Sequence, residues 1–143
     1  MAGTMRVNYP SSLRPIRIKC SARVSSDMVM RALGKGSDGV LVVGCHLGEC
    51  EYDTGVFYAT KSIEYLKQVA KAMGLEPERI QMAYCSAAEG ERFQKTAIKM
   101  DSIIKTLGPS PIKKYADENY FKAQERILKK MAAKKTTTSK TKE

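Results

Sequence analysis

The sequence predicts an α/β fold in which a small parallel sheet of about three to four strands lies between two layers of helices, a three-layer arrangement of the flavodoxin-like, doubly wound type. Two observations predict it. Short apolar segments of strand length alternate with longer segments whose apolar residues recur at helical spacing. The run Val40–Val43 is apolar throughout, as expected for a strand buried on both faces. Because strands and helices alternate, the strands should be parallel and joined by right-handed crossovers.

The first strand is predicted at Ile16–Cys20, where apolar residues alternate with Arg and Lys and one face should be solvated. Ser25 or Ser26 then caps a short helix. Asp27 falls in the first turn of that helix, where a negative charge suits the helix dipole. The buried strand already described follows.

The second half of the domain repeats this order of elements. Apolar residues at helical spacing predict a helix over residues 56–73. A third strand is predicted at residues 79–84. A helix over residues 86–107 follows, and Ser86 and Glu89 have the spacing of a capping box at its start.

The chain divides into three parts on this interpretation. Residues 1–108 form the α/β domain, residues 109–133 form a linker and a docking helix, and residues 134–143 form a disordered tail rich in Lys and Thr. A sheet of three strands leaves an edge that we expect residues 1–9 or a partner chain to complete.

The basic charge lies largely outside the predicted domain. The net charge is +10, and residues 113–143 contribute +6 of it because they contain ten Lys and Arg against four Asp and Glu. We therefore expect no nucleic-acid partner, since a binding face should be basic within the fold itself. No apolar run approaches the roughly 20 residues that cross a bilayer, so no membrane contact is expected. The start of the chain lacks the apolar core of a signal peptide, which favours a cytoplasmic location.

The four cysteines occupy related positions. Cys20, Cys45 and Cys85 each follow a predicted strand, and Cys50 lies in the loop that starts at Cys45. The carboxyl ends of parallel strands share one edge of a sheet, so these four thiols should converge there. A disulfide framework is not expected in a reducing compartment.

Three chemistries could use such a cluster. Four thiolates suit a [2Fe–2S] centre, and a zinc site could use four cysteines or three cysteines with His46. Cys85 directly precedes a helix and could be a reactive thiol of low pKa. The fourth interpretation, buried cysteines without chemistry, also stays open at this point.

Four further residues belong to the predicted site. His46 is the only histidine and is favoured as a proton-linked neighbour of the sulfurs rather than an exposed side chain. Gly44 and Gly48 flank it, and their backbone N–H groups are expected to stabilise sulfur. Arg23 could offset the charge of a cluster.

The sequence also resembles a known family. The segments Tyr9–Val24, Gly36–Tyr52 and Glu78–Phe93, with the motif Gly44-Cys45-His46-x-Gly48-x-Cys50 at their centre, are similar to the delta subunit family of methyl-viologen-reducing hydrogenase. The resemblance covers roughly residues 9–100.

The resemblance implies a non-catalytic, electron-carrying subunit with a [2Fe–2S] cluster in an obligate hetero-oligomer. Its partners would be the flavin-bearing subunit of a heterodisulfide reductase and a hydrogenase, formate dehydrogenase or benzoyl-CoA reductase, in an electron-bifurcating complex of anaerobic metabolism. The family's cysteines correspond to Cys20, Cys45 and Cys50.

The sequence departs from the family pattern in two ways. Family members begin with a further strand–helix unit that contains a Cys-x-x-Cys, and Cys85 stands where they have an apolar residue. Cys85 is therefore predicted as the fourth ligand, with thiols from a partner chain as the alternative. A scaffold that bridges two subunits without a cluster, or with zinc, is the alternative function.

Overall fold

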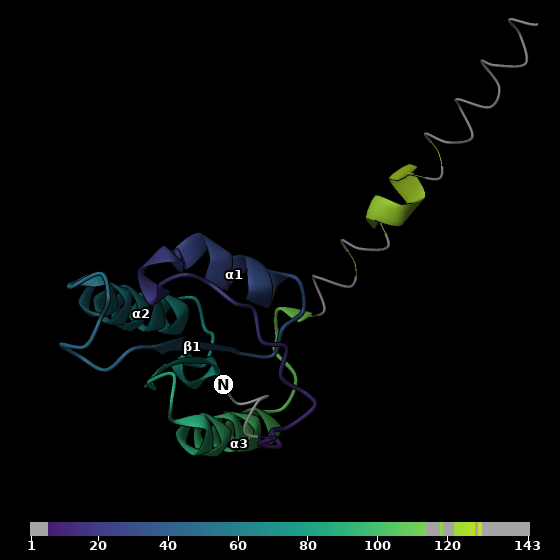
Figure 1. Ribbon diagram of the computed structural model, residues 1–143. Coiled ribbons are helices and arrows are strands. Elements are labelled where there is room, and N and C mark those ends of the chain that lie inside the picture. The colour runs from purple at the N-terminus through teal and green to yellow at the C-terminus, as the bar shows by residue number, and fades with distance from the viewer. Residues whose placement is uncertain (1–5, 114–117, 119–121, 128, 130–143) are drawn as a thin grey trace, which may run out of the picture.

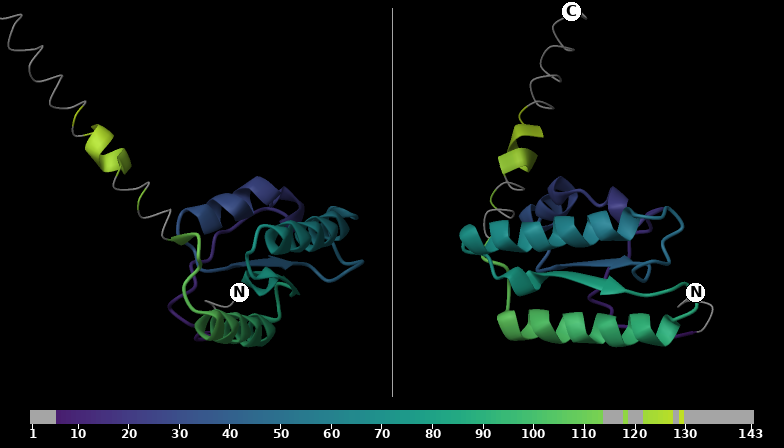
Figure 2. Two further views of the ribbon diagram at one scale, coloured as in Figure 1. Left: turned by 180° about the vertical axis from the view of Figure 1, so that it is seen from behind. Right: turned by 90° about the vertical axis from the view of Figure 1, so that its left-hand side faces the viewer.

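The computed structural model describes residues 6–113, 118, 122–127 and 129 of the chain. Helices α1 (Ser26–Gly34) and α2 (Gly55–Ala72) cover one face of a sheet, and α3 (Gly90–Leu107) covers the other (Figure 1). The same three layers are visible from behind and from the side (Figure 2). The predicted α/β class is confirmed.

The part of the sheet that the structure describes has two parallel strands, β1 (Val40–Gly44) and β2 (Ile80–Tyr84). Val40 pairs with Ile80 at the start of the strands, and Gly44 pairs with Tyr84 at their end. Helix α2 connects the two strands, so this region is a β–α–β unit. The strand count is lower than the three to four that the sequence predicts.

The strand predicted at Ile16–Cys20 is not formed. This segment has no ladder hydrogen bonds, and Cys20 leads directly into a short 3-10 helix, η1 (Ser21–Arg23). Pro15 lacks an N–H to donate, and Ile16, predicted to face the core, is 83% exposed. The segment lies across a groove from the free edge of β1 instead of pairing with it. An alternating pattern alone does not supply the neighbouring strand that a ladder needs.

The main core fills the space between the sheet and the layer of α1 and α2. Its buried side chains come from both helices, both strands and the turn after α2, and they are Val29, Leu33, Val42, Ile63, Leu66, Ala70, Leu75 and Ile80. Full burial of one such Leu or Ile side chain contributes about 1.5–3 kcal/mol. This cluster is therefore what holds α1 and α2 on the sheet.

The helix starts follow the predicted caps in one case and depart from them in the other. The side chain of Ser25 accepts a hydrogen bond from the N–H of Met28, which caps α1 as predicted. Helix α3 begins at Gly90, four residues after the predicted Ser86 cap. The carboxylate of Glu89 accepts a hydrogen bond from the N–H of Ser86 at 2.8 Å, so only this half of the capping box is present.

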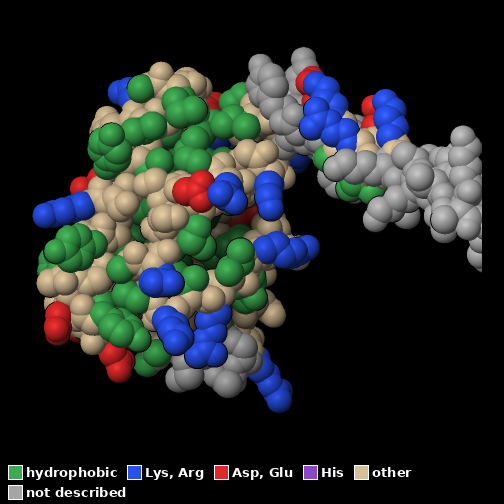
Figure 3. Space-filling view, turned by 90° about the horizontal axis from the view of Figure 1, so that it is seen from above, with side chains coloured by type: hydrophobic (Ala, Val, Ile, Leu, Met, Phe, Trp, Pro, Cys, Tyr) green, Lys and Arg blue, Asp and Glu red, His purple; other side chains and the backbone are tan. Residues whose placement is uncertain are grey.

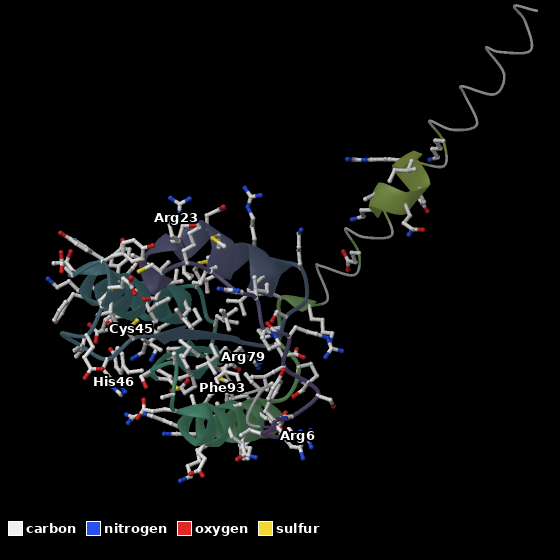
Figure 4. All side chains as sticks on the ribbon, in the orientation of Figure 1. Arg6, Arg23, Cys45, His46, Arg79 and Phe93 are labelled. Carbon is white, nitrogen blue, oxygen red and sulfur yellow. The ribbon has the colours of Figure 1, made fainter. Side chains whose placement is uncertain are left out.

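A buried arginine holds together the end of the sheet where the strands begin. Arg79 closes the 3-10 helix η2 (Pro77–Arg79) and is fully buried, and Figure 4 shows it inside the molecule. It donates to the carboxylate of Glu76 at 2.8 Å and to the carbonyl oxygens of Asp38 and Gly108 at 2.9 Å each. These bonds tie the start of β1, the start of β2 and the end of α3 to one cation.

The outward surface of α1 and α2 is mixed in character. Seen from this side, hydrophobic side chains are exposed among Lys and Arg (Figure 3). Phe57, Tyr58 and Tyr65 of α2 are among the exposed large hydrophobic residues. This layer therefore offers apolar as well as basic contact area.

No helix among the described residues is both long and apolar enough to cross a membrane. About half of the predicted linker and docking helix at residues 109–133, and all of the predicted tail at residues 134–143, lie outside the described residues. Residues 122–127 are described and are helical.

Candidate functional site

The predicted site residues gather at the end of the sheet where the strands finish. Cys45 and His46 directly follow β1, and Cys85 directly follows β2, with its N–H bonded to the carbonyl of Gly44 at 2.8 Å. Figure 4 shows Cys45 and His46 at this end, beside the loop that leads to α2. Cys45 is exposed, Cys50 is buried, and Cys20 and Cys85 are half-buried.

Cys20 and Cys50 form a thiol pair against the first residue of α2. A Cβ atom added to Gly55 would lie 2.7 Å from the sulfur of Cys20 and 3.2 Å from the sulfur of Cys50. Real Cβ atoms do not approach a neighbouring atom as closely as 2.7 Å. The absence of a side chain at residue 55 is therefore what lets both sulfurs lie over the start of this helix.

The Cys50 sulfur lies where negative charge is stabilised. The backbone N–H of Tyr52 donates a hydrogen bond to it, and this bond is the largest cause of a lowered Cys50 pKa. The N–H groups of Val56 and Gly55 act in the same direction, while burial opposes them. The Cys20 thiol also donates to this sulfur. The arrangement favours a thiolate at Cys50, the form that binds metals.

The absence of a side chain at Gly44 lets the segment that carries Cys20 pack against the end of β1. A Cβ at Gly44 would lie 2.9 Å from the hydroxyl oxygen of Ser21, so η1 packs directly on the end of β1. Ser21 is buried there. The predicted importance of Gly44 thus has a physical basis in packing: it lets the segment that carries Cys20 approach the strand that carries Cys45.

His46 is held by an acidic residue. Its Nε2 lies 2.6 Å from Oε2 of Glu89, which also accepts from the N–H of Ser86. Arg92 lies 3.5 Å from the other carboxylate oxygen. The hydrogen bond from Ser86, followed by that from His46, lowers the pKa of Glu89 to about 2. The contact joins the loop after β1 to the turn before α3.

Cys85 lies in a different environment from the thiol pair. Its sulfur donates to the carbonyl oxygens of Glu89 at 3.1 Å and of Ser86 at 3.4 Å. Burial is the first cause of a raised Cys85 pKa, and the charge of Glu89 acts in the same direction. Helix α3 begins at Gly90, so Cys85 does not directly precede a helix as predicted, and both effects act against a low pKa of this thiol.

The remaining predicted residues are at the margin of the site. Gly48 has a φ of +87°, the left-handed conformation that turns the loop between Cys45 and Cys50. Arg23 is exposed at the end of η1. Figure 4 shows it on the α1 side of the molecule, with Cys45 and His46 lower on the sheet.

The residues that the structure brings together fit part of an iron–sulfur ligand set. Within the described residues, no three His, Cys, Asp or Glu side chains lie close enough to hold a metal ion. Cys20 and Cys50 do meet, and the backbone donors at Cys50 are the kind that stabilise cluster thiolates. This pair fits two of four thiolate ligands. The predicted four-thiol set of Cys20, Cys45, Cys50 and Cys85 stays a prediction.

Two site residues were missed by the sequence reasoning. Gly55 begins α2, and nothing in the sequence around it marks it as the residue on which two sulfurs pack. Glu89 was noted for capping, but its contact with His46 joins residues 43 positions apart. No local pattern could have predicted that contact.

Comparison with protein families gives a match over most of the chain. Residues 1–108 match the model of the methyl-viologen-reducing hydrogenase delta subunit. The match contains every element of the α/β domain and all four cysteines.

Individual relatives are of two kinds. The chain is 38% identical over 109 residues to an iron-sulfur subunit of the F420-non-reducing hydrogenase of Archaeoglobus profundus, and the match covers 76% of this chain and 80% of the relative. It is 37% identical over 113 residues to the iron-sulfur subunit of the vhu F420-non-reducing hydrogenase of Methanocaldococcus jannaschii, covering 79% and 84%.

The second kind is much longer. One subunit of the ferredoxin:CoB-CoM heterodisulfide reductase of Methanosarcina mazei is 43% identical over 109 residues, and the match covers 76% of this chain but only 14% of the relative. The chain thus spans about one seventh of the length of that protein.

Proposed function

The chain belongs to the methyl-viologen-reducing hydrogenase delta subunit family, and from this premise we propose that it is an electron-transfer subunit that holds a [2Fe–2S] cluster. It passes electrons between an oxidoreductase of the hydrogenase, formate dehydrogenase or benzoyl-CoA reductase type and a flavin-bearing subunit similar to heterodisulfide reductase. The names of its relatives, which are iron-sulfur subunits of hydrogenases and subunits of heterodisulfide reductases, support this placement. The chain itself catalyses no bond chemistry and works in an electron-bifurcating complex in the cytoplasm.

The observation that carries the proposal is the thiol pair at the start of α2. Two sulfurs, from Cys20 and Cys50, lie against one glycine, and three backbone N–H groups support the negative charge of one of them. A [2Fe–2S] cluster bound there would supply one-electron redox chemistry. The protein's part is to fix the two thiolates, to direct N–H groups at sulfur, and to keep Cys50 buried.

The two other ligands come from the same edge of the sheet in this proposal. Cys45 is exposed and lies in the loop that ends at Cys50. Cys85 must exchange its hydrogen bonds to the carbonyls of Glu89 and Ser86 for iron. The alternative donors are thiols of a partner chain.

Anaerobic purification of the chain with its partners, followed by assays of iron and acid-labile sulfide, tests the proposal. We expect about two irons and two sulfides per chain, and their loss in Cys20→Ser and in Cys50→Ser. A preparation free of both elements, whose Cys50→Ser variant still sustains electron flow through the complex, would show that the chain is a scaffold.

Cys85→Ser identifies the source of the fourth thiolate. If this chain builds the site alone, the variant loses its iron to the same extent as Cys50→Ser. Full retention of iron would assign the fourth thiolate to a partner. Because serine preserves the size of the side chain and can donate to the carbonyl of Glu89 as cysteine does, the fold should be unaffected in either case.

A further inference from the structure

A groove of about 780 Å³ runs along the free edge of β1. All of Val40–Val43 line it. Consecutive side chains of a strand point to opposite faces of the sheet, so a groove on one face would be lined by every second residue. A groove lined by four in succession lies beside the strand, in the plane of the sheet.

The walls of the groove confirm this position. Val29 and Ala32 of α1 line it from one side of the sheet, and Met100 and Ile104 of α3 line it from the other. The wall that faces β1 is the extended segment 12–16, together with Ile18. The groove is therefore bounded as a strand position is bounded in a three-layer fold: a helix above, a helix below, and extended chain on either side.

An empty space of this size is not an ordinary packing defect. Protein interiors are close-packed and contain few voids larger than a water molecule. Within the described residues β1 pairs with β2 alone, so its other edge presents peptide N–H and C=O groups without strand partners. The groove thus combines apolar walls with a row of hydrogen-bonding groups, the two features that bind an extended chain.

We propose that this groove receives an extended segment of a partner polypeptide, which adds a strand to the sheet between β1 and residues 12–18. The walls specify its chemistry. Its four or five central residues are apolar on both faces, because α1 and α3 both present apolar side chains to the groove. Charged residues are expected only opposite the four charged residues of the lining, which are Arg14, Lys35, Asp38 and Asp101.

The described N-terminal residues of the chain do not occupy the groove, because they are attached elsewhere. The carbonyl of Asn8 accepts a hydrogen bond from Gln94, and the ring of Tyr9 packs edge-on against Phe93 at 5.4 Å between centroids. Ser12 donates to Asp101 at 2.6 Å. These three contacts hold the segment on α3, where it forms a wall.

A second copy of the chain is a poor occupant as well. Both strands that the structure describes are covered by helices on each face and joined through α2. Neither can enter another molecule's groove without leaving its own core. The proposal rests on the groove alone and not on the thiol site, so it stands or fails independently of the iron content.

Hydrogen exchange read by mass spectrometry tests the proposal, on the full chain alone and in the complex isolated with its native partners. Strand addition at β1 should slow exchange of peptides covering residues 39–44 at least tenfold in the complex. A photoreactive residue at Met28, which lines the groove, should cross-link to an extended apolar segment of a partner. Equal exchange in both states, or cross-links only to this chain's own residues or to a second copy, would overturn the proposal.

A variant that fills the groove gives a second measurement. Ala32→Trp places a large side chain on the groove wall, whereas Ala72→Trp places one at the exposed end of α2. We expect Ala32→Trp to weaken partner binding at least tenfold without lowering the melting temperature of the isolated chain, and Ala72→Trp to leave binding unchanged. Equal binding by the two variants would contradict a strand in the groove.

Discussion

The guanidinium of Arg79 donates a hydrogen bond of 2.9 Å to the carbonyl oxygen of Gly108, which joins the start of β2 to the residue that ends α3. The same group bonds the carbonyl of Asp38 just before β1 and the carboxylate of Glu76. A single buried cation therefore satisfies acceptors from segments far apart in sequence.

Replacing this arginine should strongly destabilise the domain. Arg79→Met keeps an apolar stem of similar length but leaves the part-buried carbonyls of Asp38 and Gly108 without the hydrogen bonds that Arg79 donates. We expect a loss of about 3 kcal/mol or more in the free energy of unfolding, measured by urea denaturation. Arg31→Met is the matched control, because Arg31 is exposed and its one salt bridge within the described part of the chain is with Asp27 on its own helix. It should change stability by less than about 0.5 kcal/mol. Similar losses in the two variants would contradict the anchoring role.

The glycine beneath the thiol pair should not tolerate a side chain. Gly55→Ala puts a Cβ 2.7 Å from the Cys20 sulfur, so the pair must separate or the helix must shift. Overpacking of this kind typically costs about 1–3 kcal/mol. We expect a lower melting temperature and reduced iron binding in the reconstituted chain.

Gly34→Ala is the control for that substitution. Gly34 is the last residue of α1, and nothing lies within 4 Å of an added Cβ. Alanine there should be neutral or stabilising, by up to about 1 kcal/mol. If Gly55→Ala behaved in the same way, the close approach of the sulfurs would not be a structural requirement.

The hydrogen bonds that the Glu89 carboxylate accepts predict a dependence of stability on pH. The pKa of Glu89 is about 2 in the folded protein, below its ordinary value of 4.5. A lowered folded-state pKa contributes stability that is fully present above pH 4.5 and is lost as the pH falls toward 2. Glu89→Gln should therefore lower the melting temperature at pH 6 and have progressively less effect between pH 4.5 and pH 3.

Glu91→Gln provides the comparison, because Glu91 is an exposed residue in the first turn of the same helix. Its effect on the melting temperature should be small at each pH. A difference between Glu89→Gln and the unsubstituted chain that stayed constant from pH 6 to pH 3 would show that the charge of Glu89, which accepts hydrogen bonds from Ser86 and His46, contributes no pH-dependent stability.

The conformation of the loop between Cys45 and Cys50 should depend on a left-handed backbone conformation at one residue, Gly48. Gly48 has a φ of +87° and nothing within 4 Å of an added Cβ, so substitution there is limited by backbone strain rather than by space. Gly48→Val should destabilise the loop by about 1–2 kcal/mol, and Gly48→Asn by less. Thermal unfolding of the two variants measures this, and equal melting temperatures would argue that the loop rearranges freely.

Local patterns in the sequence predicted most of the secondary structure. The apolar run at 40–43 and the spacing of apolar residues over 56–73 gave strand and helix positions that the structure confirms within a residue or two. Ser25 was correctly predicted as a possible helix cap because capping depends on neighbours along the chain. The residues 16–20 were wrongly predicted as a strand because pairing depends on a partner strand that periodicity cannot locate.

The site was harder to predict for the same reason. The sequence placed the cysteines at one edge of the sheet, but the direction of each thiol is set by tertiary packing. Cys50 turns toward Cys20 because Gly55 leaves room, and Cys85 turns toward the carbonyl of Glu89. The burial of Arg79 could not be predicted from the sequence either, because the carbonyl groups that accept its hydrogen bonds belong to residues up to 41 positions away.

The position of Arg79 determines which substitutions this protein should tolerate. The cation anchors the end of the sheet where the strands begin, and the cysteines lie at the opposite end, where the strands finish. Substitutions among the cysteines leave the anchor in place, so the domain should still fold when a thiol at the far end is lost, gained or moved. The two ends of the sheet can therefore change independently of one another.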